Sequence, residues 1–334
     1  MKFRLTKIFF ENFVKALFHR FRPKYRYSAI FKLKNIYDTH SKPPTLLYFG
    51  DSVVERISRD DKDKRSLGDI VHCLLKKHLS IAVISYSAYN TLIFYHLIAA
   101  IDRMKNRPKM VIIPLNIRSF SPQWDSHPLW QFENEIKAIN DFLTGQEPND
   151  GRIVDVPNMP DIYENYDDIS VQYPFSPFNK VGQFRKIIVS PPSSDPEQIF
   201  FRKKQIFIFN YLYKLDSDHR KLLSIVNILQ SLRESQISAF LYLTPINYQS
   251  GCRYVGEAFI EILKKNISLI LETVQKYGDD KMIKIADWSM LFDSDKFFHP
   301  DFANEHLIDS GRQELAKKIA SSVLLLADEV GILF

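Results

Sequence analysis

Polar residues of the types used in acyl transfer occur at three places far apart in the chain. The tripeptide Gly-Asp-Ser (50–52) follows an apolar run at 45–49, Asn116 follows a second such run, and His306 lies near the C-terminus. A serine hydroxyl becomes a nucleophile when a histidine within hydrogen-bonding reach takes its proton, and an asparagine amide can donate to an oxyanion. These residue types predict ester chemistry, provided that the fold brings them together.

A structural explanation of the tripeptide competes with the chemical one. Glycine and aspartate are common turn residues, and serine is a common residue at the start of a helix. A strand could therefore end on Gly-Asp-Ser without any catalytic role. The remaining elements of the chain have to decide between the two explanations.

Strand-like apolar runs alternate with helical patterns along the chain, which has 334 residues. The predicted strands lie at 45–49, 81–85, 110–115, 239–244 and 282–286. The predicted helices lie at 67–75, 92–104, 131–143, 197–213, 217–233, 255–277 and 310–327. This alternation predicts an α/β fold, a three-layer sandwich with a mostly parallel sheet covered by helices on both faces.

Polar residues follow several of the predicted strands. Asn116 and Arg118 come after the third strand, Asn247 comes after the fourth, and His306 follows the fifth. In parallel sheets of this kind, ligands bind outside the carboxyl ends of the strands. A site is therefore expected at that edge of the sheet.

The order of these residues resembles the SGNH hydrolases, also called the GDSL family. Gly-Asp-Ser (50–52) matches the first family block, Asn116 matches the asparagine block, and His306 followed by Gly311 matches the last block, within roughly residues 45–325. The resemblance implies a flavodoxin-like sheet, with Ser52 as nucleophile and His306 as base. It also implies an oxyanion hole made by the backbone N–H groups of Ser52 and Ala88 and by the side chain of Asn116.

Two positions depart from the family pattern. Ala88 replaces a glycine whose N–H group points into the oxyanion hole, and an alanine can keep that donor if its φ angle stays negative. Ala303 occupies the position of the family's acid, three residues before the histidine. We expect Asp301 to orient His306; the alternatives are Glu305 or a serine–histidine pair without an acid. His299 is the second candidate for the base.

The resemblance implies a serine esterase or an O-acyltransferase that acts on a small-molecule or carbohydrate ester, without metal or cofactor. Local similarity favours the polysaccharide-modifying branches of the family. Arg118, Trp124 and Asn247 are candidate substrate contacts, although rim packing explains the tryptophan and the arginine equally well. The alternatives are an inactive SGNH-fold binding or scaffold protein, and an unrelated α/β protein with a phosphate-binding or structural role.

Charge is distributed unevenly. Residues 1–35 contain ten Lys or Arg and one acid and so carry +9, whereas the whole chain carries +6 and residues 36–334 therefore carry −3. A nucleic-acid surface spread over the fold is not expected. The two cysteines, Cys73 and Cys252, exclude a disulfide scaffold and most structural zinc sites.

Residues 1–44 are expected to form a basic amphipathic N-terminal arm and a linker, the linker at 36–44, before an SGNH-like catalytic domain at 45–334. Phenylalanines at helical spacing within 1–27 suit either packing on the body or peripheral contact with an anionic membrane. Without a signal sequence, we expect a cytoplasmic protein, with the inner membrane face as an alternative. An insertion is expected at about 121–235. Within it, residues 144–196 show no clear period and are expected to form a lid, a binding loop, a disordered insertion or surface decoration.

Overall fold

A single parallel sheet forms the centre of the protein. The computed structural model describes residues 29–39, 43–104, 106–127, 130–146, 168–174, 176–190, 193–279 and 281–333. Its strands pair in the order β2-β1-β3-β4-β5, and all four pairings are parallel. Their bounds are β1 Leu46–Gly50, β2 Ile81–Ser85, β3 Met110–Leu115, β4 Ser238–Leu243 and β5 Ile283–Asp287. This is the flavodoxin-like order, so the predicted fold class is confirmed.

The three inner strands are continuous apolar runs. Every residue of β1, β3 and β4 is buried, whereas β2 and β5 at the edges are only partly buried. A strand covered by helices on both faces has no solvent-facing side, so alternation of polar and apolar residues disappears.

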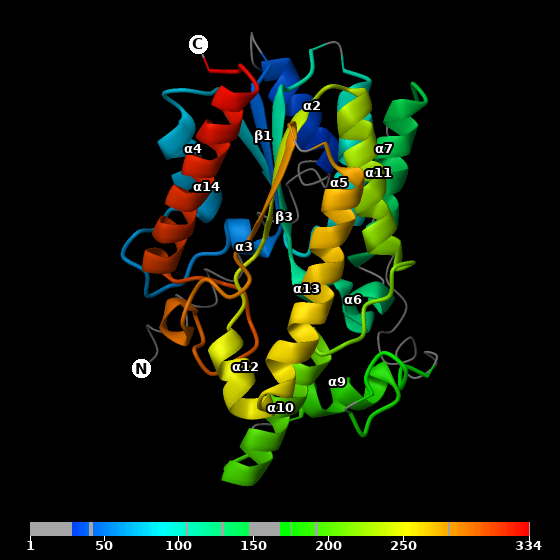
Figure 1. Ribbon diagram of the computed structural model, residues 1–334, viewed down its shortest axis with the longest axis vertical. Helices are drawn as coiled ribbons and strands as arrows, with labels where there is room; N and C mark the ends of the chain where they lie inside the picture. The colour runs from blue at the N-terminus through cyan, green and yellow to red at the C-terminus, as the bar shows by residue number, and fades with distance from the viewer. Residues whose placement is uncertain are drawn as a thin grey trace, which may run out of the picture.

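Helices cover both faces of the sheet (Figure 1). On one face α4 (Leu67–Leu75) packs against α14 (Asp309–Glu329). On the other face α11 (Arg220–Glu234) packs between α5 (Thr91–Asp102) and α13 (Ala258–Tyr277). The buried apolar residues form two clusters, one on each side of the sheet. The protein is thus a three-layer sandwich.

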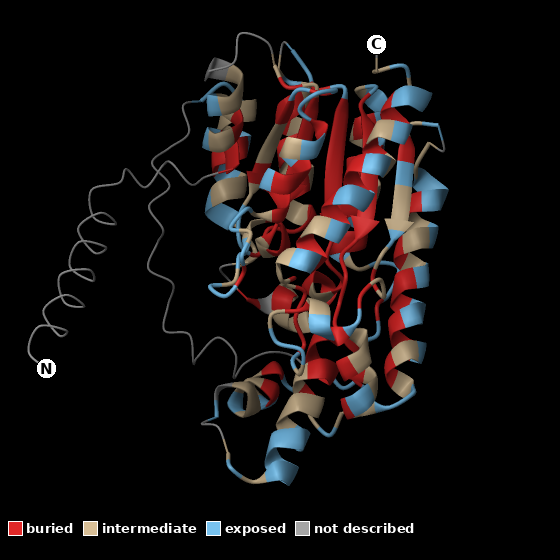
Figure 2. Cartoon of the chain, turned by 90° about the vertical axis from the view of Figure 1, so that its left-hand side faces the viewer, coloured by how far each residue is buried: buried red, intermediate tan, exposed pale blue. Residues whose placement is uncertain are grey.

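Several helices lie beyond the carboxyl ends of the strands, at the lower end of Figure 1. They include α9 (Val181–Val189), α10 (Pro196–Tyr211) and α12 (Tyr248–Val255). The first turns of α10 are exposed, at the lower tip of Figure 2. Other helices from the expected insertion are α6 (Pro122–Ser126) and α7 (Glu133–Leu143). The last helix of the expected insertion, α11, instead belongs to the layer of helices that covers the sheet. The bounds of the insertion, about 121–235, therefore stay a prediction.

The first described helix, α2 (Ala29–Thr39), packs against α5, α7 and β2 through buried residues that include Ile30 and Leu33. It extends into the predicted linker at 36–44. The amphipathic segment at 1–27, with its predicted membrane contact, lies outside the described residues. Within the described part of the chain, no helix is long and apolar enough to span a membrane.

Candidate active site

A tight turn presents Ser52 at the end of β1. Asp51 caps the short helix α3 (Ser52–Glu55), and its side chain accepts a hydrogen bond from the Val53 N–H at 2.8 Å. A Cβ atom on Gly50 would lie 2.6 Å from the side chain of Val54, so only glycine fits there. The Gly-Asp-Ser sequence therefore builds the turn and also leaves Ser52 partly exposed as the first residue of a helix.

The structure brings Ser52 and His306 together. The distance from Ser52 Oγ to His306 Nε2 is 3.0 Å, across 254 residues of sequence. Backbone bonds hold the histidine loop, because Phe298 N–H donates to the His306 carbonyl at 3.0 Å and the Asn304 side chain accepts from His306 N–H at 3.1 Å. The alternative base, His299, contacts the ring of Phe302 and makes no hydrogen bond with Ser52.

A buried ion pair clasps the two segments that carry Ser52 and His306. Arg312 Nη1 lies 2.6 Å from Asp61 Oδ2, and both side chains are at most 3% exposed. The same nitrogen donates to the Leu307 carbonyl at 2.8 Å, and Asp61 Oδ1 accepts from Asp309 N–H at 3.1 Å. The clasp thus fixes the end of the histidine loop against the chain that follows α3.

The second ring nitrogen of His306 faces a cation. Its Nδ1 atom lies 3.5 Å from Nη1 of Arg56, which is the C-cap of α3. Burial lowers the pKa of His306 to about 4; Arg56, Arg118 and His299 also lower it, whereas Glu305 opposes them. The imidazole is therefore neutral at neutral pH, as a general base requires.

Neither candidate acid is bonded to His306. The Asp301 carboxylate lies 2.6 Å from Arg253 and 3.7 Å from Lys203, and half of its side chain is exposed. Among the residues that the structure describes, no carboxylate forms a hydrogen bond with the ring of His306. The expectation that Asp301 orients His306 therefore does not match the geometry, because the two cations on α12 and α10 hold its carboxylate.

The carboxylate of Glu305 is part of a buried network. Its oxygens accept hydrogen bonds from Arg118, at 3.1 Å, and from the hydroxyl of Tyr211. Arg118 Nε also donates to Asn210 Oδ1 at 3.1 Å. Sequence reasoning missed this network because Asn210 and Tyr211 belong to α10, and nothing in their spacing shows where α10 docks.

Ala88 has a backbone conformation that residues with a side chain rarely adopt. Its φ angle is 69°, in the left-handed region, so the condition of a negative φ is not met; the backbone N–H is kept, at a cost in strain. Such a conformation costs an alanine about 1–2 kcal/mol and is found most often at functional sites. Tyr86 N–H donates to the Gly50 carbonyl at 3.2 Å, which holds the Ala88 loop next to the serine turn. In the described structure, the backbone N–H groups of Ser52 and Ala88 donate to no other group.

Asn116 and Asp51 are bonded to each other. The Asn116 side-chain amide donates to Asp51 Oδ2 at 2.8 Å, and its oxygen accepts from Arg118 N–H at 3.1 Å. Burial raises the pKa of Asp51 to about 6, although the hydrogen bonds from Asn116 and Val53 oppose the shift. The amide nitrogen has a second hydrogen that Asp51 does not use. Asn116 is thus fixed beside the serine turn with one donor to spare.

The candidate substrate contacts are engaged inside the protein. Asn247 is fully buried and donates to the carbonyls of Pro300, at 2.6 Å, and Phe302, at 3.1 Å, so it shapes the loop before His306. Trp124 is 6% exposed and lies 4.3 Å from the ring of Trp130. Buried side chains cannot contact a substrate at the surface, so both predictions are wrong for this conformation. Arg118 is paired as described above, with 24% of its side chain exposed.

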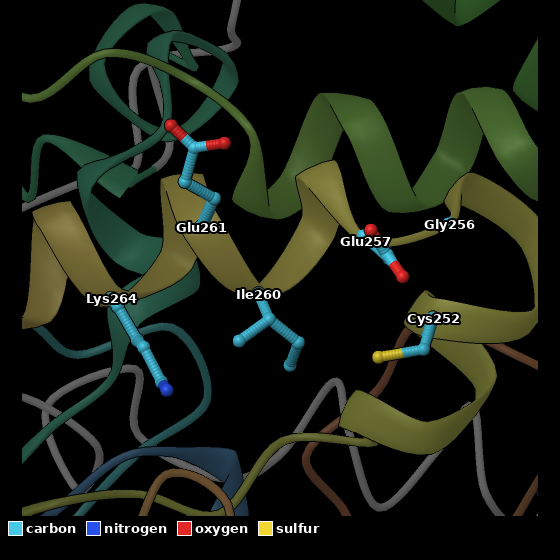
Figure 3. A pocket seen from close by; sticks show the side chains of 6 residues that line it. All are labelled: Cys252, Gly256, Glu257, Ile260, Glu261 and Lys264. Atoms are coloured by element: carbon cyan, nitrogen blue, oxygen red, sulfur yellow. The ribbon is translucent and has the colours of Figure 1, made fainter.

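A surface hollow lies elsewhere, between the end of α12 and the start of α13 (Figure 3). Its lining residues are Cys252, Gly256, Glu257, Ile260, Glu261 and Lys264. Ile260 and Lys264 point to the same side of α13, whereas Glu261 points to the other side. The hollow contains neither Ser52 nor His306. Among the described residues, no group of three His, Cys, Asp or Glu side chains could hold a metal ion.

No protein-family model matches the sequence, and the search of curated proteins gave no match. An acetylxylan esterase from Geobacillus stearothermophilus is similar in structure, with 12% identity, coverage of 83% of this chain and 93% of the esterase, and a TM-score of 0.40. The esterase AlinE4, in a mutant form, has 13% identity, coverage of 84% and 94%, and a TM-score of 0.32. These scores are too low to assign a family, so a functional assignment has to rest on the site.

Proposed function

We propose that the protein is a serine esterase or O-acyltransferase of the SGNH type that acts on an ester such as an acylated carbohydrate. The observation that carries the proposal is the 3.0 Å distance between Ser52 Oγ and His306 Nε2, at the carboxyl end of β1. A serine at this distance from a neutral imidazole has the arrangement of an activated nucleophile.

The reaction would proceed through an acyl-enzyme. His306 Nε2 takes the proton of Ser52 while Oγ forms a bond to the ester carbonyl carbon. The bond to the alcohol then breaks, and the alcohol leaves with the proton from Nε2. Water, or a second alcohol in the transferase reaction, attacks the acyl-enzyme and returns Ser52 to its starting state.

Three donors support stabilisation of the oxyanion. They are the backbone N–H groups of Ser52 and Ala88 and the second amide hydrogen of Asn116, which follow the neighbouring strands β1, β2 and β3. Loss of one such donor typically lowers turnover by about 10²–10³. The hydrogen bond from Tyr86 N–H to the Gly50 carbonyl supports this role for Ala88, since it holds the Ala88 loop next to the serine turn.

Labelling by a fluorophosphonate tests the proposal. Intact mass should show one adduct on the wild-type protein and none on Ser52→Ala or His306→Ala. Ser58→Ala, a substitution a few residues further along the same segment, is the control and should be labelled like the wild type. Absence of an adduct on a folded wild-type protein would contradict the proposal. It would favour the inactive binding protein, for which the missing acid at His306 is the specific argument.

A further inference from the structure

Arg56 occupies the side of His306 where a catalytic acid would bind. It is exposed, and its Nη1 atom lies 3.5 Å from Nδ1 of the histidine. In the described part of the chain, the guanidinium of Arg56 forms no ion pair. The other cations near the histidine loop are engaged, because Arg118 pairs with Glu305, whereas Lys203 and Arg253 pair with Asp301.

This contact favours one of the two nitrogens of His306 as the holder of the proton. A guanidinium only donates hydrogen bonds, so Nδ1 has to be the unprotonated nitrogen when it faces Arg56. The proton of the neutral ring then lies on Nε2 and points to Ser52 Oγ. In this tautomer Nε2 cannot accept the serine proton. The productive tautomer has its proton on Nδ1 and needs an acceptor there.

We propose that the ester substrate supplies this acceptor, through a carboxylate that binds Arg56 and accepts a hydrogen bond from Nδ1–H of His306. The inference rests on the proposed function and names its substrate class, O-acylated carbohydrates that contain an acidic sugar. Binding of such a substrate would convert the resting tautomer into the active one. A neutral ester, like any neutral reagent, would react only with the minor share of the protein that already holds the productive tautomer, and therefore more slowly.

Charge and geometry favour a carboxylate at this position. The planar fork of a guanidinium matches a carboxylate with two parallel hydrogen bonds, which are stronger than the single long contact to Nδ1. At 3.5 Å, the contact between Arg56 and Nδ1 is weak enough for a bound anion to replace it.

A matched pair of substrates tests the inference. Acetate release is measured from the methyl glycoside of 2-O-acetyl glucuronic acid and from the corresponding 2-O-acetyl glucoside, in which a neutral hydroxymethyl group replaces the carboxylate. For the wild type we expect kcat/KM to be higher for the acidic ester by about tenfold or more. Only the acidic ester can form the charge-assisted hydrogen bonds with Arg56. In Arg56→Ala the ratio should fall towards one, and Arg56→Lys should restore part of it. Arg59→Ala removes an exposed arginine nearby and should keep the wild-type ratio.

The pH dependence separates this role from a structural one. The charged groups that face His306 are Arg56, Arg118, His299 and Glu305. A bound carboxylate raises the pKa of His306, so for the acidic ester the acid limb of kcat should lie at higher pH than that of kcat/KM. For the neutral ester the two limbs should coincide. Arg56→Ala should move the acid limb of kcat/KM to higher pH, because it removes a cation beside the ring.

The outcomes separate this inference from the proposed function. Equal kcat/KM values for the two esters, with Arg56→Ala indistinguishable from Arg59→Ala, would overturn the inference, whereas fluorophosphonate labelling of Ser52 would still support the serine enzyme. Absence of labelling would overturn both. A preference for the acidic ester that persists in Arg56→Ala would assign carboxylate recognition to another residue and would also refute the inference.

Discussion

The two flanks of His306 differ in how completely their charges are paired. The inner flank comprises Glu305, Arg118, Asp51 and Asn116, which are buried or largely buried and bonded to one another or to α10. The outer flank comprises Arg56 and the half-exposed Asp301, and no carboxylate there bonds to the histidine ring.

This difference in charge pairing indicates which flank keeps the site in one conformation and which flank can change its partners when a ligand binds. A buried charge is costly unless it is paired, so the inner flank is fixed in one arrangement by its own energetics. An exposed arginine loses little by changing partners, because water solvates it in either state. On our proposals, the inner flank fixes the structure of the site and the outer flank provides its selectivity.

The largest expected effect comes from breaking the inner ion pair. Glu305→Ala leaves Arg118 without its partner and should lower the free energy of unfolding by about 3 kcal/mol, the lower end for a buried pair because part of Arg118 reaches solvent. Urea denaturation measures this change, and Arg56→Ala on the outer flank should change stability by less than about 0.5 kcal/mol. Similar losses for the two variants would remove the contrast between the flanks.

The next effect concerns the buried carboxyl of Asp51. Its pKa is raised from 3.8 to about 6, so the folded state keeps a proton that the unfolded state releases above pH 4. The stability that this group contributes is therefore greatest below pH 4 and is lost as the pH rises through about 6. Between pH 4 and pH 7 the wild type should lose about 2–3 kcal/mol relative to Asp51→Asn. The free energy of unfolding of both proteins is measured by urea denaturation at each pH. If it changed with pH in the same way for both, the pKa of Asp51 would not be raised in the folded state.

A smaller effect is expected from relieving strain at Ala88. Because its φ angle is positive, Ala88→Gly should raise the free energy of unfolding by about 1 kcal/mol. The substitution keeps the backbone N–H, so labelling of Ser52 should persist. Thermal unfolding is the measurement, and a destabilised variant would mean that the loop does not adopt this conformation in solution.

The smallest effect belongs to Asp301. Its ion pairs with Arg253 and Lys203 are largely exposed, so Asp301→Ala should cost less than about 1 kcal/mol. Esterase activity should stay within about twofold, because the carboxylate does not reach His306. If turnover instead fell about 10⁴-fold, as it does when a triad aspartate is neutralised, Asp301 would be the acid after all.

Sequence patterns predict the sheet well and the surroundings of the histidine poorly. The strands differ from the predicted ranges by at most one residue at each end, because continuous apolar runs mark strands covered on both faces. The predicted helix at 255–277 instead begins at Ala258, and α12 ends at Val255, with Gly256 at a φ angle of 93° between them. Gly256 is an ordinary signal for a helix end, and the predicted helix wrongly began one residue before it.

The site residues follow the same division. Ser52 and His306 follow strands of the sheet, so their proximity could be predicted from topology. The partners of Asp301, Glu305 and Asn247 depend on how α10 and α12 dock, which is a tertiary property without a local pattern. The left-handed φ angle of Ala88 was missed because propensity argues against it, and strained residues are the ones that propensity fails to find.

The clasp between Asp61 and Arg312 also has a consequence for the order of folding. During synthesis, Ser52 leaves the ribosome some 250 residues before His306, and the pair closes only when α14 docks beside α4. Contacts of such high sequence separation form late, after the more local parts of the fold have offset the entropy of closing the loop. A nascent chain with its first strands already paired would therefore hold an unreactive serine. Nucleophilic reactivity at Ser52 would thus report that the chain has folded as far as its last helix.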